Sequence, residues 1–248
     1  MSPPRLHCPD LKTGDVELPD SEVHHALTVL RMKPGDRIIL FNGRGDEGQA
    51  EVSDTAAGRL RVTVLTVESK PFELSIRLTL AVALGRQQRQ AYVIEKCTEL
   101  GVAAVWPLIS DRSVAKPQAS ITTKWQRRAI EAAKQSARAW VPQIEPPMPF
   151  DDACRRAADF PRRIIADPTA SAPLATLLGD RIRQAMIFIG PEGGWTDDER
   201  RRANAAGISP ARLAPTVLRT ETAAVAACAT VAMLALGDAD SWQGEKPL

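Results

Sequence analysis

The sequence predicts an α/β protein with two domains: a small β-barrel over residues 1–70, then a parallel sheet wrapped by helices over residues 74–242. Two observations lead to this fold class. Short β-branched segments separated by turn residues fill the first domain, as in small barrels. From Leu74 onward, short apolar segments alternate with helical ones, which is the pattern of a parallel sheet with crossover helices. A chain of 248 residues is long enough for two ordinary domains.

In the first domain, strands are expected at 37–41, 49–52 and 60–67, where Val62, Val64 and Val67 favour extended backbone. Residues 42–48 hold three glycines and form a turn-rich connector. Residues 69–72, Ser-Lys-Pro-Phe, are the expected linker to the second domain.

In the second domain, apolar runs predict strands, and helical periodicity predicts helices between them. The helix at 90–99 is expected to stop at Gly101. In the helix at 124–139, Arg127, Glu131, Lys134 and Arg138 recur at helical spacing and are expected to form the stripe opposite its smaller residues. Strands are expected at 76–83, 103–109, 162–166, 185–189 and 211–214, and a last helix at 222–236.

One of these strands runs directly into a glycine-rich turn. The apolar residues 185–189 are followed by Gly-Pro-Glu-Gly-Gly-Trp at 190–195. Thr196 and Glu199 have the spacing of a capping box, which predicts the start of a helix. Ligands bind at the carboxyl ends of strands in such sheets, and glycine backbone can lie close to them. By itself the turn indicates either a ligand site or only a tight loop, and it matches neither the Walker nor the dinucleotide motif.

A second junction downstream favours the ligand site. Residues 213–218, Leu-Ala-Pro-Thr-Val-Leu, end an apolar segment, and Arg219, Thr220 and Glu221 follow before the alanine-rich helix. Polar groups thus cluster at another strand-to-helix junction, which predicts a shared site at one edge of the sheet.

Charge is unevenly distributed. The net charge is only +2, but Arg112 to Arg138 contains seven basic residues and one acidic residue. Such a region can bind phosphates, although a solvated helix face is an equally good interpretation.

Composition argues against metal and membrane proteins. The four cysteines are widely spaced, and the three histidines show no helical pair of metal ligands. A zinc site and a disulfide framework are therefore not expected, and a cytoplasmic location fits. No apolar segment is long enough to cross a bilayer, and residues 1–12 do not form a signal peptide.

Together these segments resemble the RsmE family of ribosomal RNA methyltransferases, which belongs to the SPOUT superfamily. Besides the two C-terminal junctions, the resemblance rests on residues 24–31 and 33–36, on Lys-Cys-Thr-Glu-Leu-Gly at 96–101, and on residues 111–114 and 135–138. It covers nearly the whole chain and implies a PUA-like first domain and a deep trefoil knot in the second. Ala214 and Thr216 stand where the family usually has Gly and Arg, and Asp167 where His is common, which puts details of RNA contact in doubt.

The resemblance also implies the reaction. S-adenosylmethionine would donate a methyl group, without a metal, to N3 of a uridine in 16S ribosomal RNA, the uracil-1498 position. The substrate would be the small ribosomal subunit or its late assembly particle. Two other classes stay open: a SPOUT enzyme that methylates another RNA position such as a ribose 2′-oxygen, and an RNA-binding assembly factor without activity.

Site residues follow from the matching positions. Arg219 would stabilise charge on uracil, and Glu221 would accept the N3 proton or orient Arg219. If extended backbone continues through Thr220, both side chains share a face. The alternatives are an Arg219–Glu221 pair, or a Glu221 that stabilises the start of the helix. Glu192 is equally ambiguous. The donor pocket is expected at Gly190, Pro191, Glu192, Gly193, Gly194, Leu213 and Leu218. RNA phosphates would be held by Arg31, Arg112, Arg127, Arg128 and Arg138, with solubility as the alternative role.

The last helix is also a candidate for assembly. Its small residues would permit close packing, and SPOUT enzymes generally pair through this domain, so a homodimer is expected. The alternative is a helix buried within its own domain. The small residues are Ala224, Ala227, Ala232 and Ala235.

Overall fold

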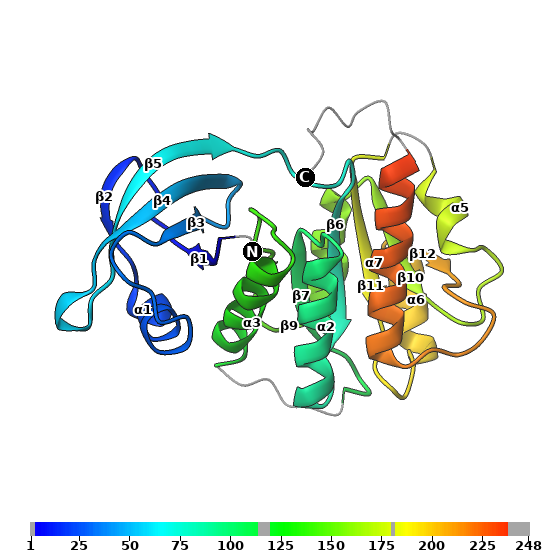
Figure 1. Ribbon diagram of the computed structural model, residues 1–248. Helices are drawn as coiled ribbons and strands as arrows, with labels where there is room; N and C mark the ends of the chain where they lie inside the picture. The colour runs from blue at the N-terminus through cyan, green and yellow to red at the C-terminus, as the bar shows by residue number, and fades with distance from the viewer. Residues whose placement is uncertain (1–2, 114–119, 180–181, 238–248) are drawn as a thin grey trace. The chain divides into compact units, whose positions relative to one another are not determined.

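The chain divides into two compact units (Figure 1). The computed structural model describes residues 3–113, 120–179 and 182–237. Unit 1 comprises Met1–Phe72 and Ile130–Val141, and unit 2 comprises Glu73–Ala129 and Pro142–Leu248. Each unit has its own cluster of buried apolar side chains, as expected for domains.

Unit 1 is built on a five-stranded sheet in the order β1-β3-β4-β5-β2. Only β1 and β3 are parallel; the other pairs are antiparallel. Buried and solvent-facing residues alternate along β4, because one face of the sheet covers the core. The three expected strands are confirmed, but the expected connector at 42–48 is too long, since its last three residues begin β4. The strands are β1 (Arg5–His7), β2 (Gly14–Glu17), β3 (Arg37–Phe41), β4 (Asp46–Asp54) and β5 (Arg61–Ser69).

Short helical segments complete unit 1. Helix α1 (Asp20–His24) continues into a π-helix (His25–Val29), and a 3-10 turn spans Ala56–Gly58. The residues of unit 1 from the second part of the chain include Lys134, whose ammonium lies 3.1 Å from Glu22 Oε2. Both side chains are almost fully buried, at 5% and 4% exposure.

This buried pair corrects one prediction. The stripe expected opposite the smaller residues of the helix at 124–139 does not form as predicted, because the helix ends at Gln135, before Arg138, and both Lys134 and Arg138 are buried. Helical spacing identifies residues that share a face, but it does not say whether that face meets solvent or another element.

Unit 2 contains a seven-stranded sheet in which every pair is parallel. The order is β12-β10-β11-β6-β7-β8, and β9 also pairs with β7. All five residues of 185–189 are buried, because the central strand β11 is covered on both faces. The strands are β6 (Arg77–Ala83), β7 (Ala104–Ile109), β8 (Gln143–Ile144), β9 (Met148–Pro149), β10 (Arg162–Ala166), β11 (Gln184–Ile189) and β12 (Ser209–Ala211).

The strand expected at 211–214 is misplaced, since β12 ends at Ala211. The backbone of Arg212 turns away from the sheet and pairs with another segment. Its N–H donates to the carbonyl of Ala172 at 2.8 Å, and its carbonyl accepts from the N–H of Leu174 at 2.9 Å. Residues 212–219 are therefore a loop.

Helices cover both faces of this sheet (Figure 1). Helix α7 packs on β6 and β11 and lies beside α2, whereas α4 contacts α6 and β7. Helix α2 ends before Gly101, whose φ of 89° confirms the expected stop. The helices are α2 (Gln87–Glu99), α3 (Ile121–Gln135), α4 (Phe150–Arg156), α5 (Leu174–Leu178), α6 (Asp197–Ala205) and α7 (Thr220–Gly237), with a 3-10 turn at Ala157–Asp159.

Candidate functional site

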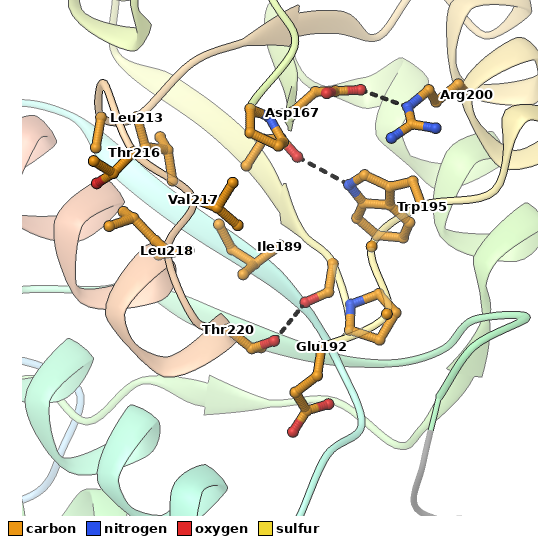
Figure 2. A pocket seen from close by; sticks show the side chains of 18 residues that line it. Asp167, Ile189, Glu192, Trp195, Arg200, Leu213, Thr216, Val217, Leu218 and Thr220 are labelled. Carbon is orange, nitrogen blue, oxygen red and sulfur yellow. Dashed lines mark hydrogen bonds and ion pairs between the residues drawn. The ribbon is translucent and has the colours of Figure 1, made fainter.

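A cavity of about 280 Å³ lies where β10, β11 and β12 end and α7 begins (Figure 2). This is the carboxyl edge of the sheet, where ligands bind in α/β proteins. Its walls combine apolar side chains with the backbone of the glycine-rich turn, and the apolar set includes Ile189, Val217 and Ala223. All seven residues expected to form a donor pocket line this one cavity: Gly190, Pro191, Glu192, Gly193, Gly194, Leu213 and Leu218.

The turn after β11 requires glycine at two positions. Gly194 has a φ of 68°, which side chains disfavour, and its N–H donates to the Pro191 carbonyl at 2.9 Å. A Cβ at Gly190 would lie 3.0 Å from the indole ring of Trp195. That indole is fixed by its own hydrogen bond, in which Nε1 donates to the carbonyl of Ala166 at 2.9 Å (Figure 2). Trp195 therefore holds the turn against the end of β10.

Arg112 supports the same turn. Its Nη1 donates to the carbonyl of Gly193 at 2.7 Å, and a Cβ at Gly193 would meet the Arg112 side chain at 3.3 Å. Arg112 was expected to contact RNA phosphates. The structure adds a contact with the ligand-lining turn that no local motif could indicate, because the two residues are 81 positions apart.

The helices on either side of the turn are fixed by capping bonds. The predicted capping box at α6 is confirmed: the N–H of Glu199 donates to Thr196 Oγ1, and the N–H of Thr196 donates to Glu199 Oε2. At α7, Thr220 Oγ1 donates to the carbonyl of Gly190 at 2.8 Å (Figure 2). Thr220 thus ties the start of α7 to the end of β11.

Asp167 and Arg200 line the same cavity, and the sequence analysis did not assign either residue to it. Arg200 Nε donates to Asp167 Oδ2 at 2.6 Å (Figure 2). Burial raises the pKa of Asp167, but hydrogen bonds from Thr169 and Arg200 outweigh it and hold the pKa below its usual range. The position of Asp167 directly after a parallel strand was the signal that could have identified it.

Glu192 and Glu221 share one cation. Arg89, from α2, donates through Nη1 to Glu192 Oε1 at 3.3 Å, and its Nε lies 3.7 Å from Glu221 Oε1. The other oxygen of Glu221 is buried and has no hydrogen-bond partner among the residues that the structure describes. Arg89 was not among the expected site residues, because its partner Glu192 lies 103 positions away along the chain.

The expected arrangement of Arg219 and Glu221 is wrong. Extended backbone does not continue through Thr220, because α7 begins there, and Glu221 lies in the first helical turn. Arg219 is exposed and precedes the helix, and its carbonyl accepts from the N–H of Ala223 at 2.8 Å. The period-two argument for a shared face therefore does not apply, although Leu218 and Thr220 on either side of Arg219 both line the cavity.

The candidate RNA-contact residues fall into different environments. Arg31 and Arg127 are exposed, whereas Arg128 pairs with Glu95. Arg138 is only 4% exposed, and its guanidinium lies 5.8 Å from the centroid of the Phe72 ring. A buried guanidinium is poorly placed to bind a phosphate, so Arg138 is not proposed as an RNA contact. Lys116, which contributes to the basic region, lies outside the described residues.

The described residues contain neither a cluster of metal-binding side chains nor a helix that could span a membrane. No group of three or more His, Cys, Asp or Glu side chains among them could hold a metal ion. No helix in the described ranges is long and apolar enough to cross a membrane.

Comparison with known proteins identifies relatives along most of the chain. A family model described as "RNA methyltransferase domain" matches residues 72–232, and one described as "RNA methyltransferase PUA domain" matches residues 18–65. Ribosomal RNA small subunit methyltransferase E of Synechocystis is 33% identical over 227 residues, which cover 87% of this chain and 72% of that protein. The Bacillus subtilis protein of the same name is 30% identical, with 85% of this chain and 86% of that protein covered.

Solved structures agree with these matches. The crystal structure of ribosomal RNA small subunit methyltransferase E from Neisseria gonorrhoeae, bound to S-adenosyl methionine, is 32% identical, with a TM-score of 0.85. A putative methyltransferase from Legionella pneumophila, in complex with S-adenosylmethionine, is 30% identical, with a TM-score of 0.88. Each similarity covers 94% of this chain and 98% of the other.

Proposed function

The chain belongs to the RsmE family of ribosomal RNA small subunit methyltransferases, and from this premise we propose that it methylates N3 of a uridine in 16S ribosomal RNA with S-adenosylmethionine as donor. By resemblance the target is uracil-1498. One observation supports this most directly: the expected donor-pocket residues all line one cavity at the carboxyl edge of the parallel sheet. Methylation of small-subunit particles, followed by identification of the methylated nucleoside, tests it.

The cavity suits this donor. Backbone groups of residues 190–194 can recognise polar groups of the ligand, while Ile189, Leu213 and Leu218 offer an apolar surface to an adenine ring. When bound, S-adenosylmethionine supplies a methyl group already activated by its sulfonium, so positioning and removal of the N3 proton are the tasks left to the protein. None of these tasks needs a metal.

Val217 gives a direct test of the donor pocket. Its side chain lines the cavity but is 81% exposed, so a bound ligand would cover it. Val217→Ser removes apolar contact worth about 1–2 kcal/mol and is expected to weaken donor binding roughly tenfold in calorimetry. The fold should be unaffected because the side chain is exposed. Leu65→Ser, at an exposed apolar residue of unit 1 outside the cavity, is the matched control; equal affinities in both variants would move the donor elsewhere.

In the proposed reaction the uridine is flipped or single-stranded, so that N3 can reach the methyl group. The N3–C bond forms as the C–S bond breaks, its electron pair stays on sulfur, and the N3 proton leaves to a base. We assign charge stabilisation on the uracil to Arg219 and proton acceptance to Glu221. Glu192, which lines the cavity itself, is the alternative acceptor.

Phosphates of the RNA are proposed to contact the exposed basic residues Arg31, Arg112 and Arg127, with Arg128 in a smaller role because it already pairs with Glu95. Arg127→Gln combined with Lys124→Gln on α3 is expected to weaken RNA binding. It should also reduce the slope of log affinity against log salt by about 0.7–0.9 for each lost contact. Arg162→Gln, at the exposed first residue of β10, is the control. If the double variant has the same salt slope as this control, the basic residues of α3 form a solvated face and do not bind RNA.

The remaining proposals also rest on membership of the RsmE family. We propose an RNA-binding domain at 1–70 and a methyltransferase domain at 74–242, which we expect to be knotted. We also propose that the enzyme acts in the cytoplasm, on the small ribosomal subunit or its late assembly particle. A homodimer is supported by Met233, Leu234 and Leu236, which are exposed apolar residues at the end of α7. Ala224 and Ala227 are instead fully buried within the chain itself. A monomer mass in light scattering at micromolar concentration would rule the dimer out.

A further inference from the structure

Three separate segments bring charged side chains together beside the donor cavity. Arg89 comes from the first turn of α2, Glu192 from the glycine-rich turn, and Glu221 from the first turn of α7. The guanidinium uses two different nitrogens: Nη1 donates to Glu192 at 3.3 Å, and Nε lies 3.7 Å from Glu221. Two carboxylates brought this close without a cation would repel each other, so the guanidinium is what permits their approach.

The backbone around the cluster is built to hold these positions. A Cβ at Gly85, just before α2, would lie 3.3 Å from Glu192 Oε1, so any larger residue would press on that carboxylate. The hydrogen bond from Thr220 to the Gly190 carbonyl fixes the start of α7 against the turn that carries Glu192. In Figure 2 the Glu192 carboxylate points away from Val217 and Ile189, past Thr220.

One carboxylate oxygen in the cluster has no hydrogen-bond partner among the described residues. Glu221 Oε2 is buried, and the described residues supply it with no hydrogen-bond donor. Leaving a buried acceptor without a hydrogen bond is costly, so such groups usually have a functional reason.

We infer that Arg89 is a positioning residue for methyl transfer. Its guanidinium bridges Glu192 and Glu221, and it holds Glu221, the carboxylate that receives the N3 proton of the uridine, in place. The inference rests on the proposed function. The proton passes from N3 to a carboxylate oxygen while the methyl group passes from sulfur to N3, so charge and atoms balance. Arg89 itself neither binds the donor nor exchanges a proton.

The test compares three variants with the wild-type protein in single-turnover methylation of small-subunit particles that lack the modification, at saturating donor. Arg89→Gln removes the cation, and Arg89→Lys keeps the charge but loses the planar fork that reaches both carboxylates. Arg201→Gln removes a cation from α6, where Arg201 pairs only with exposed Asp198 among its described contacts, and is the matched control.

Arg89→Gln is expected to lower the methylation rate by about 10- to 100-fold, the scale of lost acid–base positioning. The loss should appear in the rate at saturating small-subunit particles, and not in the particle concentration that gives half of that rate, because Arg89 is not proposed to bind RNA. Arg89→Lys should restore part of the rate, while donor affinity in calorimetry stays within about twofold of wild type in both.

Three outcomes would overturn the inference. A wild-type rate in Arg89→Gln does so alone, and so does a rate in Arg89→Lys no higher than in Arg89→Gln, which would make Arg89 merely structural. Loss of donor affinity in Arg89→Gln would place the residue in the donor pocket instead. A wild-type protein that transfers no methyl group to RNA would overturn the proposed function, and this inference with it.

Discussion

Arg219→Ala is expected to lower single-turnover methylation by about two orders of magnitude, the usual effect of removing one group that stabilises developing charge. Arg219 is exposed and lies between Leu218 and Thr220, which both line the cavity, so its guanidinium is free to approach a base placed at the cavity mouth. Donor affinity should survive, because the cavity wall is formed by neighbouring residues and by backbone. The measurement is a single-turnover time course on small-subunit particles, with calorimetry of the donor alongside.

Glu221→Gln separates the proton acceptor from the charge stabiliser. The substitution keeps the size of the side chain and removes its charge, so the rate should fall if the carboxylate accepts the N3 proton. Thr222→Val, at the next residue, is exposed and makes a matched control on α7. Wild-type rates in both Arg219→Ala and Glu221→Gln would place the chemistry elsewhere, with Glu192 as the next candidate.

Lys134→Met is expected to destabilise unit 1 by about 3–5 kcal/mol, because it leaves the carboxylate of Glu22 buried without its cation. Lys134 also lies 2.6 Å from Glu131, but that carboxylate is half exposed and can be rehydrated. The effect therefore comes from Glu22 alone. Scanning calorimetry should show the transition that belongs to unit 1 moving to lower temperature.

Two further variants make this result specific. Glu131→Gln should cost less than about 1 kcal/mol, as surface ion pairs do. Combining Lys134→Met with Glu22→Leu should recover most of the loss, because a buried ion pair can be exchanged for apolar side chains at little net cost. If Lys134→Met alone is as stable as the wild type, water must reach the carboxylate of Glu22.

Most of the fold could be predicted from local patterns. The run 185–189 has an apolar residue at every position and is ended by Gly and Pro, which favours a short strand buried on both faces. The spacing of Thr196 and Glu199 predicts the start of α6, and Gly101 predicts the end of α2. Strands β1 and β2 have only three and four residues, too few to show an alternation, and were missed.

What the sequence could not indicate depends on partners far along the chain. Lys134 has the spacing of a surface residue, and only Glu22, 112 positions away, explains why it is buried. The same holds for Arg112 with Gly193 and for Arg89 with its two carboxylates. The expected donor-pocket residues do line one cavity, because they follow parallel strands that end at the same edge. The geometry at Arg219 and Glu221 was wrong because the boundary of α7 lies at Thr220, and helix ends are set by tertiary contacts such as its bond to Gly190.

The central claim, methylation of a uridine at N3, is tested most directly by incubating the protein with small ribosomal subunits from a strain that lacks this enzyme and with S-adenosylmethionine labelled in its methyl group. Digestion to nucleosides and mass spectrometry then identify the product. The account predicts that the label appears in 3-methyluridine at one position of 16S ribosomal RNA, and that Arg219→Ala greatly reduces it. Label in a ribose 2′-O-methyl nucleoside, or no label in RNA at all, would contradict it.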